Sequence, residues 1–415
     1  MVVRETLSPC PLCDKILNTK IIRQGDDLWM KKECQQHGIF EDLYWKGADF
    51  YNEVAGIVKR AECNSFDCVG CADHVKYSAC IMVDVTKRCN LNCPICYANA
   101  NDGQTKEPTA EQIVGKLPTV QTKVKPNIVL SGGEPTLRKD LPEIISAIIK
   151  KGYVPRVVTN GIKLQDDGYL AELKKSGLSW IILQFDGFSD TVYEALRGEK
   201  LSKLKLDVIE KMSKYDFKIQ LSVMVAKGIN DMEIGKIVKY ALKHKSIFWV
   251  SFYPASVVGR NTLKQDTRIF PLEIMDILSR ETDGRITKED FLKSMKLWNL
   301  LHSITGNPVY KQKMCTFPIL IYSENGNFFP INKLLHPTFL LKHFKAALKT
   351  VSSSRNLMNF ERRHTPKNFL FLSIEKLCDA SVLDLVQARD CHMVSMTRDD
   401  FMPFCIYNAR YRDKT

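Results

Sequence analysis

Six short apolar runs rich in β-branched residues alternate with helix-like stretches through the middle of the chain. The runs are Ile81–Val85, Asn127–Leu130, Val154–Val158, Trp180–Phe185, Ile219–Val225 and Phe248–Phe252. The capping-box spacing that starts many helices occurs between them at Thr109–Gln112, Asp140–Glu143 and Asn230–Glu233. Strands that alternate with helices predict a parallel sheet with right-handed crossovers. Six such units predict an α/β fold, an open partial (β/α)6 barrel rather than a closed eight-fold one.

Three cysteines follow the first predicted strand with the spacing C-x3-C-x2-C: Cys89, Cys93 and Cys96. Three thiolates on so short a loop can hold three corners of a 4Fe–4S cube. The fourth iron then keeps an open position that can chelate a small molecule. Tyr97 comes next, where an aromatic ring could cover one face of the cluster. The alternative is a zinc knuckle or a set of buried cysteines.

Polar groups also mark the ends of the next four predicted strands, where the reactive groups of parallel sheets gather. The second strand ends in Ser131-Gly132-Gly133-Glu134-Pro135, whose glycines let the backbone approach a ligand closely. The carboxylate of Glu134 could bind an ammonium group. The later strands contribute Thr159, Asn160, Asp186 and Ser222. The alternative for these polar groups is a turn, a helix cap or a bond to backbone amides.

The cysteine motif, its aromatic neighbour and the following Gly-Gly-Glu resemble the signature of the radical S-adenosylmethionine (SAM) enzymes. In that superfamily the open iron binds the amino and carboxylate groups of SAM, and one electron cleaves SAM to methionine and a 5′-deoxyadenosyl radical. The resemblance implies that Cys89, Cys93 and Cys96 hold the catalytic cluster. It implies SAM contacts from Tyr97, Gly132, Gly133, Glu134, Thr159, Asn160, Asp186 and Ser222.

The chain has 14 cysteines, most of them in short spacings that favour metal sites over disulfides. One group pairs Cys10-x2-Cys13 with Cys34-x2-His37, which suits zinc or a rubredoxin-like iron. A second group is Cys63, Cys68 and Cys71, followed by His74, which suits an iron–sulfur cluster better than zinc. Cys80 is predicted to be a buried strand residue. The scattered Cys315, Cys378, Cys391 and Cys405 have no metal-ligand spacing, and isolated cysteines are usually small buried hydrophobes.

The order of the cysteine motifs resembles the archaeal tetraether lipid synthase family, whose relatives include proteins named as pterin methyltransferases. The motifs are CPLC, ECQQHG, ECNSFDCVGCADH, VDVTKRCNLNCPICYANAN and FMPFCIYN. The resemblance implies a mononuclear site at Cys10, Cys13 and Cys34, with His37 in place of a fourth cysteine. It implies one auxiliary 4Fe–4S cluster at Cys63, Cys68 and Cys71 and a further one at Cys315, Cys391 and Cys405.

The resemblance also divides the chain. It implies a cysteine-rich metal-binding region over 1–78, the barrel over 79–265, a helical connector over 266–310 and an auxiliary-cluster extension over 311–415. The stretch from about 332 to 368 departs from the family pattern and contains no motif.

The family reaction joins the terminal carbons of two isoprenoid chains of glycerol phospholipids, so tetraether lipid formation is the first expectation. Radical methylation of a pterin or other small molecule is the alternative. A compact site lined by hydrogen-bonding groups would favour the pterin, and long apolar grooves would favour the lipid. An iron–sulfur or zinc protein that binds nucleic acid is the non-enzyme alternative. An external electron donor such as ferredoxin or flavodoxin is implied, in an anaerobic or strongly reducing host.

The 415 residues suggest two or three domains, and an apolar share of 45% is ample for a buried core. The N-terminus has no apolar h-region, and no segment approaches the roughly 20 apolar residues of a spanning helix. We therefore expect a cytoplasmic protein. The net charge of +13 would suit peripheral contact with an anionic membrane surface. No nucleic acid is expected, because no aromatic–basic motif accompanies the charge.

Overall fold

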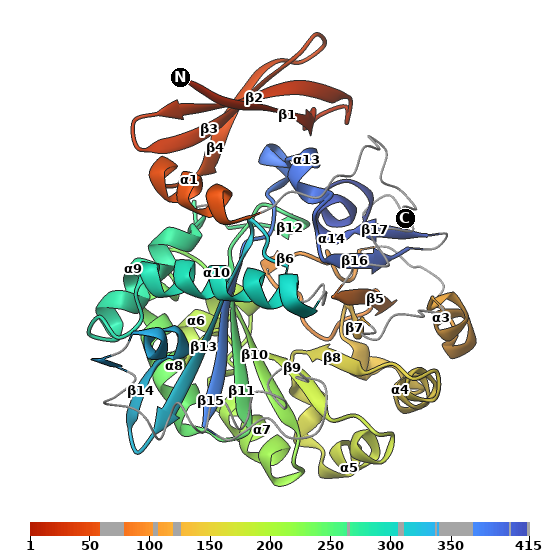
Figure 1. Ribbon diagram of the computed structural model, residues 1–415. Coiled ribbons are helices and arrows are strands. Elements are labelled where there is room, and N and C mark those ends of the chain that lie inside the picture. The colour runs from red at the N-terminus through yellow and green to blue at the C-terminus, as the bar shows by residue number, and fades with distance from the viewer. Residues whose placement is uncertain are drawn as a thin grey trace.

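The computed structural model describes residues 1–58, 79–102, 107–118, 126–263, 266–305, 311–336, 338–339, 368–397 and 400–412. These residues form an eleven-stranded sheet, a four-stranded sheet and a two-stranded ribbon (Figure 1). The strands are β1 Val2–Pro9, β2 Ile16–Gln24, β3 Asp27–Cys34, β4 Gly38–Trp45, β5 Cys80–Thr86, β6 Ile95–Cys96, β7 Asn127–Gly132, β8 Pro155–Thr159, β9 Trp180–Gln184, β10 Lys218–Val225, β11 Ile247–Pro254, β12 Arg260–Asn261, β13 Thr316–Glu324, β14 Asn327–Pro330, β15 Phe369–Glu375, β16 Met393–Met396 and β17 Phe401–Pro403.

The longer helices cover the outer face of the large sheet or link it to the N-terminal sheet (Figure 1). The helices are α1 Ala48–Ile57, α3 Ala110–Lys116, α4 Leu141–Lys150, α5 Asp167–Lys175, α6 Asp190–Arg197, α7 Ser202–Lys214, α8 Ile234–Lys243, α9 Pro271–Glu281, α10 Lys288–Thr305, α13 Leu385–Ala388 and α14 Phe404–Ile406. None of the helices in the described part of the chain is long and apolar enough to cross a lipid bilayer.

All six predicted strands are present, as β5 and β7 to β11, and they are mutually parallel in the order β5-β7-β8-β9-β10-β11. The α/β prediction is therefore confirmed. The sheet continues beyond them on both sides, which the sequence did not predict. β15 lies parallel to β11, and β16 lies parallel to β5, so two C-terminal strands flank the six.

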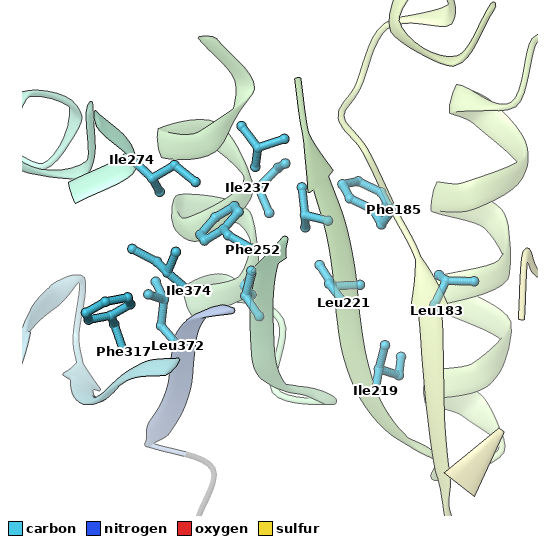
Figure 2. Close-up of a cluster of buried hydrophobic side chains, with 14 of the residues drawn as sticks. Leu183, Phe185, Ile219, Leu221, Ile237, Phe252, Ile274, Phe317, Leu372 and Ile374 are labelled. Carbon is cyan, nitrogen blue, oxygen red and sulfur yellow. The ribbon is translucent and has the colours of Figure 1, made fainter. Parts of the chain in front are cut away.

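The two faces of the parallel strands differ because side chains alternate along a strand. One set of positions packs under the helices in the main apolar core. Figure 2 shows part of that set, in which Leu221 and Phe252 from two adjacent strands face Ile237 of α8 and Ile274 of α9. The alternate set lines an internal cavity on the other face. Burial of the first set stabilises the sheet, whereas side chains of the second set face the cavity and could contact a ligand.

The N-terminal sheet is an antiparallel meander in the order β1-β2-β3-β4. It is tied to the C-terminal region by an ion pair between Arg4 and the buried Asp384, which precedes α13. Thr6 also donates to Asp384, over 2.6 Å. Lys32 Nζ donates to the carbonyl oxygen of Ser381 over 2.7 Å. Segments nearly 380 residues apart in sequence are therefore held side by side (Figure 1).

Only one of the three predicted capping boxes forms. The Thr109 hydroxyl accepts from the Gln112 backbone N–H, and the Gln112 side chain accepts from that of Thr109. Asp140 makes no capping hydrogen bond because its carboxylate binds Arg138. Asn230 is also no cap: its side chain accepts from Ala226 N and donates to the carbonyls of Asp186 and Met224. Both of those box predictions are wrong, since other hydrogen-bond partners take the two side chains.

Candidate active site

The loop that carries Cys89, Cys93 and Cys96 lies at the carboxyl end of β5. Its last part forms β6, which pairs antiparallel with β12, so that Cys96 lies opposite Arg260. The Arg260 guanidinium donates to the carbonyl oxygens of Cys93 and Ala100, each over 2.9 Å. This arginine, which the sequence analysis missed, fixes the shape of the loop from outside it.

Gly132 and Gly133 bring the end of β7 into backbone contact with the same loop. The Gly133 N–H donates to Thr86 O over 2.7 Å, and the Glu134 N–H donates to Arg88 O over 2.8 Å. A Cβ atom on Gly133 would collide with the carbonyl oxygen of Arg88. Gly132 has φ +121°, in the region that favours glycine. The two glycines therefore join the cysteine loop to the glutamate that follows.

The three cysteine side chains gather in one apolar cluster that includes Leu91 and Tyr193, and all three border the main cavity. Burial raises the pKa of Cys89 to about 11 and also raises that of Cys93. Buried thiols of raised pKa need a strong cationic centre to be held as thiolates. The three thiols of Cys89, Cys93 and Cys96 at the edge of a cavity therefore fit an iron–sulfur cluster that would keep one open iron.

Glu134 is only 1% exposed, yet it borders the cavity. Its Oε1 accepts from the Thr136 and Thr159 hydroxyls over 2.6 and 2.7 Å, and its Oε2 accepts from the Asn160 backbone N–H over 2.7 Å. These bonds hold an ionised carboxylate in place, with lone-pair capacity left on Oε2. Thr159 and Asn160, both predicted to contact a ligand, thus also orient Glu134.

Asp186 is fully buried and does not border the cavity; its partner Arg197 does. Arg197 Nε and Nη2 donate to the two oxygens of Asp186 over 2.6 and 2.9 Å. The structure therefore places a buried bidentate ion pair where a direct ligand contact from Asp186 was expected. Arg197 is the group that reaches the Cys93 side, and the sequence analysis missed it because it lies on a helix, α6, rather than at a strand end.

Tyr97 and Ser222 both border the cavity, as predicted for cofactor contacts. The Tyr97 hydroxyl lies 2.6 Å from Ser131 Oγ, and its ring packs tilted against Phe404 at 5.8 Å between centroids. Burial raises the pKa of Tyr97 to about 12, so its hydroxyl stays protonated at neutral pH. Its ring is thereby fixed beside Cys96.

The main cavity has a volume of about 370 Å³ and extends from the cysteine loop along the inner face of the sheet. Its walls near the loop include the residues just described. Away from the loop, the cavity extends to the other end of the strands, where Asn127 is the first residue of β7 and Trp180 is the first residue of β9. Cys80, the predicted buried strand residue, opens β5 and lines the cavity there, partly buried.

A second, smaller cavity of about 100 Å³ brings four cysteines together: Cys315, Cys378, Cys391 and Cys405. Cys405 is within hydrogen-bonding reach of Cys378 and Cys391. A hydrogen bond from Cys405 lowers the pKa of Cys391 to about 7, whereas burial raises that of Cys315 to about 12. Cys378, the fourth member, was not predicted as a ligand because nothing in its sequence spacing marks it as one. Four thiols around one void, two of them buried and two partly buried, fit the donor set of an iron–sulfur cluster.

Cys10, Cys13, Cys34 and His37 form a third group, as their spacing predicted, with their ligand atoms all within 4.8 Å of one another. Two tight turns present them, one after β1 and one between β3 and β4. The Gln36 backbone N–H and then His37 lower the pKa of Cys34 to about 6, which favours a thiolate. Three sulfurs and one imidazole at this separation fit a tetrahedral metal ion. The predicted group of Cys63, Cys68, Cys71 and His74 lies outside the described residues.

The chain is similar over nearly its whole length to a protein of Methanocaldococcus jannaschii named 7,8-dihydro-6-hydroxymethylpterin dimethyltransferase. The two are 30% identical over an alignment that covers 99% of this chain and 94% of the relative. The family model "Radical SAM superfamily" matches residues 83–241. The chain belongs to the radical SAM superfamily. A second model, "HMPTM N-terminal zinc ribbon domain", matches residues 2–46, which hold the Cys10–His37 group.

Other similarities cover part of the chain. A probable GTP 3′,8-cyclase of Pyrococcus abyssi is 32% identical over 40% of this chain and 54% of its own length. Among solved structures, Streptococcus suis SuiB bound to its precursor peptide SuiA matches 50% of this chain and 46% of its own at 19% identity, with a TM-score of 0.42. The protein is thus a radical SAM enzyme that uses a 4Fe–4S cluster and SAM, with a further metal site in its N-terminal ribbon.

We expect Glu134→Gln to weaken SAM binding without changing iron content. The amide keeps the size of the side chain but loses the charge that would meet an ammonium group, and it turns one acceptor into a donor facing Thr159 or Asn160. A charge-assisted hydrogen bond is worth about 1.5–3 kcal/mol, so the affinity should fall roughly 10- to 100-fold. Equilibrium binding of SAM, with iron counted on the same sample, measures this. Unchanged SAM affinity would restrict Glu134 to a structural role, and the exposed Glu289→Gln on α10 is the control.

Proposed function

We propose that this enzyme carries out radical methylation of a compact nitrogen heterocycle of the pterin type. The observation that carries the proposal is the set of buried polar atoms that border the cavity without a hydrogen-bond partner among the described residues. They include Asn127 Oδ1, Trp180 Nε1 and Gln220 Oε1. A site for a purely apolar substrate would have no use for such atoms, since burying them unpaired is costly. The name of the full-length relative supports the same substrate class.

Each part of the site has a separate role in this proposal. When bound, the cluster and SAM would supply abstraction of a hydrogen atom from an unactivated C–H bond, for which no side chain has suitable acidity. A further SAM would supply the methyl group that replaces the hydrogen, and the electron donor would supply the electrons for both steps. Cys89, Cys93 and Cys96 hold the cluster at the mouth of the cavity. Glu134 and Arg197 present one negative and one positive charge beside it, which suits the ammonium and the carboxylate of an amino acid. The buried walls exclude water, so a reactive substrate is not quenched.

The other cysteine groups support the chemistry from outside the cavity. We propose that Cys315, Cys378, Cys391 and Cys405 hold an auxiliary 4Fe–4S cluster, and that Cys63, Cys68 and Cys71 hold another. The N-terminal site, which has three cysteines and His37, favours zinc over a rubredoxin-like iron, which takes four sulfurs. A ferredoxin or flavodoxin is the proposed electron donor.

Joining of isoprenoid chains is the second candidate, and the apolar wall of the cavity favours it. Met82, Val129, Val158 and Ile182 form a continuous apolar strip across four neighbouring strands. Because it crosses three interstrand spacings of about 4.8 Å each, the strip is roughly 14 Å long. That length would accept the end of an acyl chain, and the +13 charge would suit phosphorylated headgroups at a membrane surface.

Anaerobic reconstitution with iron and sulfide, followed by mass spectrometry of the products, separates the two candidates. The enzyme is incubated with SAM, a reductant and either 7,8-dihydro-6-hydroxymethylpterin or an archaeal diether phospholipid. We expect a mass increase of one or two methyl groups on the pterin. Coupled lipid without any pterin product would overturn the proposal in favour of the second candidate. The Cys93→Ala variant, treated identically, is the control for product formed without the cluster.

A further inference from the structure

The far part of the main cavity, around Arg156 and Trp180, is bordered by polar side chains from adjacent strands of the sheet. Asn127, Arg156 and Trp180 lie at or near the starts of β7, β8 and β9, and Gln220 lies within β10. Tyr253, Ser373 and Glu375 come from near the carboxyl ends of β11 and β15, and the charge of Arg156 acts on Glu375. Each of them belongs to the strand face opposite the main apolar core. None of them is used by the chemistry at the cysteine loop. Burying these polar groups costs free energy unless each is hydrogen-bonded, either to a neighbour or to a ligand.

Three of these groups have atoms with unused hydrogen-bonding capacity. Asn127, Trp180 and Gln220 are each 5% exposed or less. Asn127 Oδ1 and Gln220 Oε1 are acceptors, Trp180 Nε1–H is a donor, and no described residue pairs with them. The Gln220 amide is held by its other end, which donates to Ser251 Oγ over 2.9 Å. Its free oxygen is therefore fixed rather than free to rotate.

Aromatic and cationic planes lie beside these atoms. The Arg156 guanidinium stacks on Trp180, with Cζ 3.3 Å from the ring centroid. Trp249 lies 5.9 Å from Trp180 between centroids and is anchored by its Nε1–H, which donates to Ser373 Oγ over 2.9 Å. Trp249, locked by its own hydrogen bond, and the stacked Arg156–Trp180 pair form a flat surface for a flat ligand, with little entropy left to lose.

Glu375 supplies a carboxylate that could accept hydrogen bonds from the N–H groups along one edge of a ligand. Its Oε1 accepts from Ser373 over 2.8 Å, and Tyr253 also hydrogen-bonds to the carboxyl group, so the remaining lone pairs of the carboxylate are the acceptors left for a ligand. Burial raises the pKa of Glu375, although the Ser373 bond and the Arg156 charge act in the opposite direction. A ligand that offers N–H groups would favour the ionised form in the same way.

From these groups, and resting on the proposed function, we infer that the far end of the cavity is the recognition subsite for a 2-amino-4-oxopyrimidine ring. Glu375 and Gln220 accept from the amino and ring N–H groups. Trp180 Nε1 and Arg156 donate to the ring carbonyl, and Trp249 covers its face. Because the cavity continues from there to the cysteine loop, the rest of the substrate is directed toward Cys89, Cys93 and Cys96. The competing occupant is ordered water that hydrogen-bonds to the same polar atoms.

The test is equilibrium binding of 7,8-dihydro-6-hydroxymethylpterin to the full-length, reconstituted protein under anaerobic conditions. We expect Glu375→Gln to weaken binding roughly 10- to 100-fold, because an amide N–H₂ would face donors. Trp180→Phe keeps the ring but removes one neutral donor, so a loss of up to about 10-fold is expected. Glu289→Gln, on the exposed side of α10, should bind like the wild type.

A ligand change tests the same contact without changing the protein. The analogue that lacks the 2-amino group should bind the wild type at least about 10-fold more weakly than the parent. If the wild type binds the parent and both variants and the analogue behave like it, the subsite is overturned while the proposed function stands. If the wild type binds no pterin at all, the proposed function itself fails, and water is the occupant of the far end.

Discussion

Replacement of Cys93 by alanine should abolish cleavage of SAM. Cys93 is buried between Tyr193 and the cavity, and two neighbouring thiols complete the ligand set. A cube held by two protein ligands on this loop would lose its iron, so about four iron atoms per chain should disappear. Iron and sulfide analysis and an assay of 5′-deoxyadenosine measure both effects. Formation of 5′-deoxyadenosine should fall by more than about 1,000-fold, as expected when one member of a set of residues that acts together is removed.

Asn92→Ser is the matched control, since Asn92 is an exposed neighbour on the same loop. It should retain both iron and cleavage. A Cys93→Ala protein that still forms 5′-deoxyadenosine at the wild-type rate would show that this loop does not hold the catalytic cluster. The same preparation should keep the N-terminal metal, because the Cys10–His37 group lies on a separate sheet.

The second large effect is expected from Cys378→Ala in the four-cysteine cavity. Removal of one of four ligands should cost this cluster, again about four iron atoms, while the loop cluster stays intact. If the auxiliary cluster handles the substrate after hydrogen abstraction, methylated product should fall at least about 10-fold while 5′-deoxyadenosine still forms. Iron content, melting temperature and product distribution on one sample distinguish this from simple unfolding.

Met314→Leu tests the cavity itself, because Met314 lines it without offering a thiolate. This near-isosteric change should keep iron and product close to wild-type values. Normal iron content in Cys378→Ala would contradict the four-cysteine cluster. Equal loss of both products together with a lowered melting temperature would assign the cavity a structural role only.

The strands could be predicted from the sequence because each is a short, dense apolar run bounded by turn residues, such as Ile219–Val225. The cysteine loop and Gly132–Glu134 could be predicted because their ligands are close together in sequence. The N-terminal group was equally local, and its geometry agrees with the spacing. These predictions depend on local signals, which a single sequence carries well.

The remainder depends on contacts between distant segments. Cys378 joins Cys405 only because the segment after β15 packs with α14 in one apolar cluster, and Arg197 reaches the cysteine loop only through the packing of α6. The inner face of the sheet did have a local signal that was overlooked. Gln220 and Ser222 alternate with apolar residues along β10, which marks two faces with different roles. Asp140 and Asn230 show the opposite failure: the capping-box spacing is present in the sequence, but other hydrogen-bond partners take the side chain.

The placement of β15 and β16 has a consequence for how the chain is made. Both flanks of the parallel sheet are completed by strands near its C-terminal end: β15 beside β11 and β16 beside β5. During synthesis, the edges of β5 and β11 stay uncovered until residues 369–396 have left the ribosome, and unpaired edges invite pairing with other chains. We therefore expect a product terminated before β16 to aggregate through the exposed edge of β5.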